Sequence, residues 1–287
     1  MNDLSKYILL AETGSDLPKE IAERYNIYIV PMHVSLGDET LDDGAFPVEE
    51  ICNYYARTKK LPKTSGSSPE DFNVIFDKIH DEWPDKHIIY LAYSAVTTCS
   101  YQSGCIASED RDYVTSIDTQ QVSAGQTAVI YETAKLLEEQ PHITLEELIK
   151  AVEVFCKRTK MCFVPDELEY LRAGGRVSNA VAMGGKLLSI HPAIEIEDGY
   201  LIAKKKYRGR MDRVGIKLVK DFTEKHNLQK DHIWLLWAIG LSEEIRRTIE
   251  QAARDYGYEK ITWIQTGCVI TTHGGPGAFG LVGLTNQ

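Results

Sequence analysis

Three short segments combine hydroxyl, imidazole and glycine residues in patterns that could bind an anion. They are Thr64-Ser-Gly-Ser-Ser-Pro69, Ser94-Ala-Val-Thr-Thr-Cys-Ser-Tyr101 and His273-Gly-Gly-Pro-Gly277. Each is predicted at a junction between a loop and a helix, where backbone N–H groups and hydroxyls bind carboxylates and phosphates. We therefore expect a site for an anion.

The two hydroxyl-rich segments also admit a purely local interpretation. Thr64 and Ser65 precede a predicted helix, and Thr97, Thr98 and Ser100 lie between a predicted strand and the next helix. Serine and threonine are preferred at helix N-termini for local reasons, so either segment alone is typical of a helix cap. Two segments with several hydroxyls each favour a site.

His273 has three possible roles. An imidazole can activate a hydroxyl nucleophile, for which Thr98 or Ser100 would serve. It could equally donate a hydrogen bond to a bound carboxylate, or only satisfy the turn before the glycines. The chain has no G-x-S-x-G motif and no identifiable carboxylate to orient the ring. The residue types alone leave these roles open.

Hydrophobic periodicity predicts strands that alternate with helices in the first half of the chain. Capping boxes at Ser68 with Asp71, and at Thr144 with Glu147, mark two helix starts. The predicted strands span 7–11, 27–34, 87–93 and 113–118. The predicted helices span 46–56, 69–79, 100–110, 124–139 and 144–158, with a shorter one opened by Leu17-Pro18. This alternation indicates a parallel sheet covered on both faces.

The pattern changes after Pro165 to a mixture of helices and a hairpin. Helices are predicted at 167–173, 179–188, 214–225 and 242–256, and strands at 190–195, 200–207, 232–238 and 261–265. We expect an α/β protein with an N-terminal parallel-sheet α/β domain, residues 1–160, and a C-terminal mixed α+β domain, residues 161–287. The second domain carries the GGR, KYRG and HGGPG motifs, and we expect the ligand between the two domains.

Composition excludes several classes of protein. The 287 residues include 32 basic and 42 acidic side chains, a net charge of −10, which argues against nucleic-acid binding. No apolar run approaches the ~18 residues that span a bilayer, and the N-terminus does not resemble a leader, so we expect a cytoplasmic protein without stable membrane insertion. The six cysteines contain no C-x-x-C pair, and we expect free thiols, no metal and no cofactor.

One basic stretch departs from the acidic background. Between Lys204 and Lys220 there are eight basic residues and one acid, Asp212. Such a run is usually a solvated face. It could instead recruit an acidic protein partner or bind phosphate.

Taken together, the motifs resemble those of the DegV family of bacterial fatty-acid-binding proteins. Glu12-Thr-Gly-Ser-Asp-Leu-Pro18 is similar to the D-S-T-x-D-L-P of that family, and the hydroxyl-rich segments are similar to its T-S-Q-P-S-P and S-S-x-L-S-G-T-Y. Further matches are Ile117-Asp-Thr119 with Ser123-Ala-Gly-Gln126, Leu168-Glu-Tyr-Leu-Arg-Ala-Gly-Gly-Arg-Val-Ser178, Lys206-Tyr-Arg-Gly209 and His273-Gly-Gly-Pro-Gly277. The resemblance covers nearly the whole chain.

The resemblance implies a two-domain carrier that sequesters one long-chain fatty acid and is not itself an enzyme. Thr64, Thr98 and His273 would hold the carboxyl group, and Ser65 and Gly274 would complete the ligand-binding residues. A partner fatty-acid kinase would convert the presented carboxylate to an acyl phosphate. The residues implied at the surface that meets this kinase are Arg176, Lys206 and Arg208.

Three departures from the family motifs keep alternatives open. Glu12 replaces an aspartate, Gly66-Ser67 replaces Gln-Pro, and Thr97-Thr-Cys-Ser100 replaces Leu-Ser-Gly-Thr. A different acyl chain or another carboxylate therefore stays possible. The second function class is an enzyme, an acyl ester or phosphate ester hydrolase or transferase, with a threonine or serine nucleophile and His273 as base.

Overall fold

Four parallel strands form the first sheet, sheet A. The computed structural model describes residues 5–177 and 190–286, and sheet A has the strand order β2-β1-β6-β7. All three pairings are parallel. The strands are β1 (Tyr7–Glu12), β2 (Tyr28–Val30), β6 (His87–Ala92) and β7 (Val114–Asp118). The parallel sheet predicted for the first half is confirmed.

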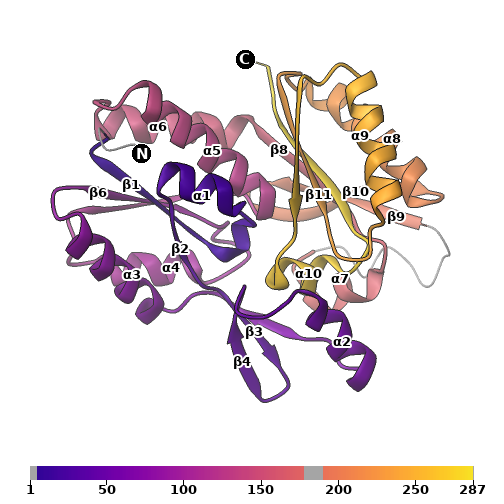
Figure 1. Ribbon diagram of the computed structural model, residues 1–287, viewed down its shortest axis with the longest axis horizontal. Helices are drawn as coiled ribbons and strands as arrows, with labels where there is room; N and C mark the ends of the chain where they lie inside the picture. Colours follow the sequence, from indigo (N-terminus) through magenta and orange to yellow (C-terminus); the bar gives the residue numbers. More distant parts are fainter. Residues whose placement is uncertain (1–4, 178–189, 287) are drawn as a thin grey trace.

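Helices cover both faces of sheet A (Figure 1). Successive β1 side chains point to opposite faces, so Tyr7 and Leu9 pack with α1, α5 and α6, while Ile8 and Leu10 pack with α3 and α4. These helices are α1 (Lys19–Tyr25), α3 (Pro69–Glu82), α4 (Ser100–Ala107), α5 (Ser123–Glu139) and α6 (Leu145–Arg158), and a short 3-10 helix, η1 (Thr13–Ser15), follows β1. Burial on both faces explains why the strands are nearly continuous apolar runs.

Two of these helices begin at the predicted capping boxes. At α3 the Ser68 hydroxyl accepts a hydrogen bond from the Asp71 N–H, and the Asp71 carboxylate accepts one from the Ser68 N–H. Thr144 and Glu147 make the same reciprocal pair at α6. Each pair satisfies N–H groups that have no partner inside the helix, so both predicted starts are confirmed.

A six-stranded mixed sheet, sheet C, occupies the second half of the chain. Its strand order is β10-β9-β8-β13-β11-β12, and β11 with β12 is its one parallel pair in the described ranges. The strands are β8 (Thr159–Val164), β9 (Ile190–Glu197), β10 (Tyr200–Arg208), β11 (His232–Trp237), β12 (Lys260–Gln265) and β13 (Phe279–Leu284). The predicted hairpin is β9 and β10, with Asp198 and Gly199 at positive φ in its turn.

The two faces of sheet C have different neighbours. Helices α8 (Met211–His226) and α9 (Glu243–Asp255) cover one face. The other face packs against the start of α5, α7 (Leu168–Gly174) and α10 (Cys268–Gly274), and this core also takes in Met32 and Tyr93 from the first half. A continuous apolar core therefore joins the two halves of the chain.

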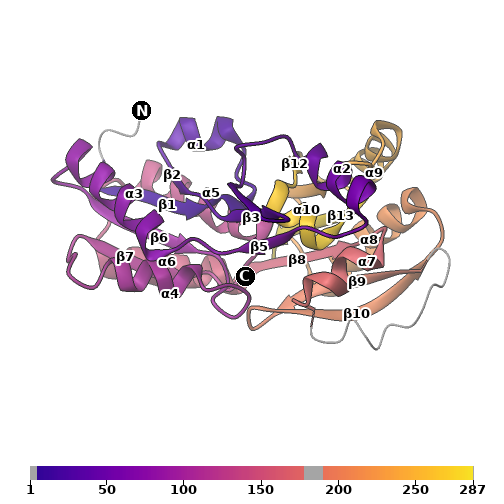
Figure 2. The same cartoon turned by 90° about the horizontal axis from the view of Figure 1, so that it is seen from below.

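A small antiparallel sheet, which the sequence did not predict, lies beside α10. It has the order β4-β3-β5 and consists of β3 (His33–Leu36), β4 (Glu39–Asp42) and β5 (Lys63–Ser65), with α2 (Glu49–Thr58) between β4 and β5 in the chain. Figure 2 shows β3 and β5 next to α10, which they contact.

The single strand predicted at 27–34 is wrong. The chain forms β2 in sheet A, breaks at Pro31-Met32, and continues as β3 in the small sheet. Proline has no N–H to donate to a strand ladder, so the chain changes partners at this point. The break places Met32 in the core between the two halves.

The expected fold class, a parallel-sheet α/β half followed by a mixed α+β half, is confirmed. The division at residue 160 stays a prediction, although β8 begins one residue before it. The helix predicted at 179–188 lies outside the described residues. Within the described ranges, no helix has both the length and the apolar character needed to span a membrane.

Candidate ligand-binding site

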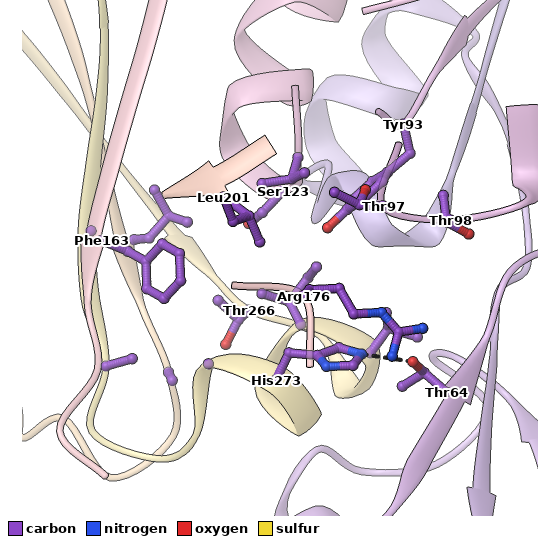
Figure 3. A pocket seen from close by; sticks show the side chains of 18 of the residues that line it. Thr64, Tyr93, Thr97, Thr98, Ser123, Phe163, Arg176, Leu201, Thr266 and His273 are labelled. Atoms are coloured by element: carbon purple, nitrogen blue, oxygen red, sulfur yellow. Dashed lines mark hydrogen bonds between the residues drawn. The ribbon is translucent and has the colours of Figure 1, made fainter. Parts of the chain in front are cut away.

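A pocket lies between sheet A and sheet C, and both halves of the chain line it (Figure 3). It contains about 850 Å³ of space outside the atoms, including open solvent at its mouth. The apolar lining consists of Met32, Tyr93, Val122, Met161, Phe163, Leu201, Leu236, Ala238, Val269, Ile270, Ala278 and Phe279. Most of the wall can therefore bury an apolar ligand.

A polar group of residues forms one end of this pocket. His273 Nε2 and Thr64 Oγ1 are 2.7 Å apart and share a hydrogen bond, although the two residues are 209 positions apart in the chain. Figure 3 shows the Arg176 guanidinium close to this pair, with Phe163 on the far side of the pocket. The site thus has a polar end and an apolar body, as an amphipathic anion requires.

Every residue that the resemblance implied for ligand binding lines this pocket. Thr64 and Ser65 come from the end of β5, Thr98 from the loop before α4, and His273 and Gly274 from the end of α10. No observation tests their roles in binding, so these stay predictions.

The three cations implied at the kinase surface, Arg176, Lys206 and Arg208, differ in their position relative to the pocket. Arg176 lines the pocket, is exposed, and donates a hydrogen bond to the Gly174 carbonyl at 2.8 Å. Lys206 and Arg208 are exposed on β10 and do not line the pocket. Arg176 alone among these three could therefore act on a pocket ligand directly.

His273 is held neutral by its surroundings. Burial, followed by the nearby positive charge of Arg176, lowers the pKa of its imidazole to about 4. A neutral ring at pH 7 carries one N–H, which can be donated to an anion. A base with so low a pKa is poorly matched to proton abstraction near neutral pH.

The enzyme alternative finds little support in this geometry. His273 bonds to Thr64 and not to Thr98 or Ser100, whose hydroxyls lie 3.2 Å from each other. His273 Nδ1 is buried and has no hydrogen-bond partner among the described residues. A Cβ on Gly174 would lie only 2.4 Å from this nitrogen, so no orienting carboxylate fits there.

The predicted position of the glycine-rich motif relative to its helix is wrong. His273 lies in the last turn of α10, and Gly275 and Gly277, at positive φ, form the turn that leads to β13. The C-terminal end of a helix carries partial negative charge, so this segment cannot attract an anion through the helix dipole. Within this segment, an anion can be attracted only by the His273 side chain and its neighbours.

The loop before α4 is in the predicted place, between β6 and the helix start at Ser100. The Ser100 hydroxyl accepts a hydrogen bond from the Ser67 N–H at 3.0 Å. A Cβ on Gly66 would lie 2.4 Å from Thr98 Oγ1 and 2.6 Å from Ser100 Oγ. Gly66 therefore allows the end of β5 to approach the Thr98 loop closely.

Sequence reasoning missed the apolar lining and Ser123, the first residue of α5. Residues such as Leu236 and Val269 carry no signal that separates them from ordinary core. Ser123 has a φ of 48° and lies where the family motif was recognised, but its place in the pocket follows from the tertiary fold alone. Within the described ranges, no group of three or more His, Cys, Asp or Glu side chains is arranged to hold a metal ion.

Comparison with known proteins assigns the chain to a family. The family model described as an uncharacterised protein of the DegV family matches residues 6–286. The chain belongs to the DegV family. A relative from Thermotoga maritima named "Fatty acid-binding protein" is 30% identical, over 96% of this chain and 96% of its own length.

Solved structures of DegV proteins have the same fold. A DegV family protein from Thermus thermophilus, described by its fatty acid binding, is 26% identical with a TM-score of 0.87, and the match covers 98% of this chain and 99% of that one. A Thermotoga maritima protein, reported to reveal a fatty acid binding function, is 28% identical with a TM-score of 0.81 over 98% and 99% of the two chains. The family predicted from the motifs is confirmed.

Proposed function

We propose that this DegV protein binds one long-chain fatty acid in the pocket between its two sheets. Thr64, Thr98 and His273 hold the carboxylate of the fatty acid, and the acyl chain lies along the apolar wall. The observation that carries the proposal is the His273–Thr64 pair at one end of a mostly apolar pocket. Fatty acid binding by the Thermotoga and Thermus relatives supports it.

The acyl chain supplies most of the affinity. More than a dozen methylenes, at roughly 0.8 kcal/mol each, outweigh the cost of ordering the ligand. The carboxylate contributes orientation, because a charge removed from water must be matched by hydrogen bonds. The His273–Thr64 hydrogen bond uses one proton of that pair and leaves the other for the carboxylate. The Thr98 hydroxyl can donate a second hydrogen bond, and the positive charge of Arg176 favours an anion nearby.

Native mass spectrometry of the purified protein tests this proposal first. We expect one fatty acid of about 14–18 carbons per chain, released on denaturation, because tail burial sets the affinity. An empty protein that binds no added fatty acid, or one that releases a different carboxylate, contradicts the proposal.

The head-group part of the proposal predicts a preference for the acid over the alcohol of equal length. We expect delipidated protein to bind tetradecanoic acid about tenfold or more tighter than tetradecan-1-ol, since hydrogen bonds to charged groups contribute about 1.5–3 kcal/mol. Competition binding gives the ratio of the two dissociation constants, called below the acid preference. Equal affinities would show that the polar end does not recognise the carboxylate.

We further propose that the protein presents the carboxylate to a fatty-acid kinase through a basic surface. Arg176, Lys206 and Arg208 are all exposed, and among the described residues no ion pair neutralises Lys206 or Arg208. Electrostatic complementarity of this kind acts mainly on the association rate and on the choice of partner.

The kinase surface predicts a variant that separates docking from ligand binding. Changing Lys206 and Arg208 together to glutamate should lower kinase-dependent acyl phosphate formation about tenfold or more at low salt, and leave the bound fatty acid in place. The matched control is Lys157→Glu, an exposed cation at the end of α6. Loss of the ligand in the double variant, or equal loss in the control, would argue against a docking role.

A further inference from the structure

The helix that carries His273 is fixed at its opposite end by two carboxylates from the start of the chain. Asp43 Oδ1 accepts hydrogen bonds from the Cys268 N–H at 2.9 Å and from the Val269 N–H at 3.4 Å. Asp16 Oδ1 accepts one from the Gly267 N–H at 2.7 Å. These bonds join positions at least 225 residues apart, so they tie α10 to the first half of the molecule.

The side chains of Asp16 and Asp43 take the place of an N-cap side chain, which α10 lacks. Its N-cap residue, Gly267, has no side chain, and the first N–H groups of a helix find no partner within it. An aspartate side chain suits this place, because its carboxyl oxygen accepts hydrogen bonds from free N–H groups whether or not the acid is ionised. Asp16 and Asp43 are 9% and 6% exposed, so little water competes with them.

Gly267 allows both carboxylates to approach the helix start. A Cβ at this position would lie 3.3 Å from Asp16 Oδ1 and 3.3 Å from Asp43 Oδ1. Asp16 reaches the pocket as well, because its second carboxylate oxygen accepts a hydrogen bond from the hydroxyl of Ser123, which lines the pocket. The pair thus connects the start of α10 with a second part of the pocket wall.

The helix is too short to absorb a displacement of its first turn. Seven residues span about 10 Å, at 1.5 Å per residue, so His273 lies less than two turns from the carboxylates. The His273–Thr64 hydrogen bond, at 2.7 Å, weakens steeply once its geometry departs from the normal range. A tilt of α10 at its start would therefore move the imidazole away from Thr64.

We propose that Asp43, supported by Asp16, is a positioning residue for the carboxylate end of the pocket. It anchors the first turn of α10 so that His273 Nε2 meets Thr64 and the bound head group. This inference rests on the proposed fatty acid function. Neither aspartate lines the pocket of His273, so each acts through the helix and not on the ligand.

Two substitutions at one position test the proposal. Asp43→Ala removes the acceptor, whereas Asp43→Asn keeps an oxygen in the place of Oδ1 and can still accept from Cys268. We expect Asp43→Ala to lower the acid preference about tenfold and to leave tetradecan-1-ol affinity nearly unchanged, and we expect Asp43→Asn to restore most of the preference. Asp38→Ala, which removes an exposed carboxylate in the turn between β3 and β4, is the control for charge.

A second measurement needs no ligand. NMR titration of His273 in delipidated protein, assigned with a His273→Gln variant, should place its pKa near 4 in the wild type. It should rise toward the ordinary value in Asp43→Ala, because a displaced ring is better hydrated, but not in Asp43→Asn. A global unfolding measurement on each variant identifies any that simply fails to fold.

The outcomes separate this inference from the proposed function. An unchanged acid preference together with an unchanged His273 pKa in folded Asp43→Ala overturns the positioning role. Equal losses for acid and alcohol also overturn it, because they indicate a general effect on the fold. If the wild type shows no acid preference, the proposed function fails, and the His273 titration still decides whether Asp43 positions the ring.

Discussion

Replacing Gly174 by alanine should abolish most of the acid preference. Gly174 ends α7, and an added Cβ would lie 2.4 Å from His273 Nδ1 and 3.3 Å from Cγ of the same ring. Real Cβ atoms do not approach so closely, so the ring must rotate and give up its hydrogen bond to Thr64. We expect tetradecanoic acid to bind about 10- to 100-fold more weakly, equivalent to about 1.5–3 kcal/mol for a bond to a charged group.

The same substitution should leave the apolar part of the pocket intact. Alanine is the better helix former, so α7 itself should not be weakened. Tetradecan-1-ol affinity should therefore change little, and Ala173→Ser, at the exposed preceding residue, should alter neither ligand. A Gly174→Ala protein that keeps its full acid preference would show that the His273 ring position does not matter for the head group.

The stability of the delipidated protein should fall as the pH rises from about 6.5 to about 8. Burial raises the pKa of Asp16 to about 8 and that of Glu12 to about 7. Both groups stay protonated in the folded state above the pH at which the unfolded chain releases its protons. Their contribution to stability is complete below the ordinary aspartate and glutamate values and is lost as the pH rises through 7 and 8.

The expected loss over this range is about 2–3 kcal/mol, at about 1.4 kcal/mol per pH unit and group. His273 acts in the opposite sense, because its lowered pKa of about 4 makes stability fall only as the pH drops below about 6.5. Its contribution changes by only about 0.4 kcal/mol across the range in question. Urea unfolding at several pH values gives the free energy of unfolding directly.

The variant Asp16→Asn tests whether Asp16 causes the fall in stability between about pH 6.5 and pH 8. Asparagine cannot ionise, tolerates the left-handed backbone that Asp16 adopts at φ 55°, and keeps an acceptor for the Gly267 N–H. We expect its stability to fall by about 2 kcal/mol less than that of the wild type between about pH 6.5 and pH 8. An unchanged slope in this variant, or an equal change in Asp38→Asn, would assign the pH dependence to other groups.

Local signals predicted much of the fold, because local interactions determine those parts. The buried strands β1 and β6 are continuous apolar runs, and the starts of α3 and α6 are set by side chains three residues apart. The elements that were missed depend on distant partners. The three strands of the small sheet are only three or four residues long. The break at Pro31 depends on the pairing of β2 and β3 with two different sheets, which is a tertiary interaction.

Helix α10 shows why part of the site could not be predicted. Its run from Val269 to Thr272 is β-branched, which favours a strand, and Gly267 gives no capping signal. The helix is held instead by Asp16 and Asp43, two aspartates that nothing in the sequence connects with it. The hydroxyls and imidazole of the polar end were recognisable by residue type, but their distances depend on this long-range support.

The polar end of the pocket draws on three segments that are far apart in the chain. Thr64 ends a strand of the small sheet, Thr98 precedes a helix of the parallel half, and His273 ends a helix near the C-terminus. If these three residues hold the head group as proposed, its recognition is consequently not modular. Neither half expressed alone would contain all three side chains, and transplanting any single loop onto another scaffold would transfer one donor without the others. Only exchange of a whole chain between family members carries this specificity with it.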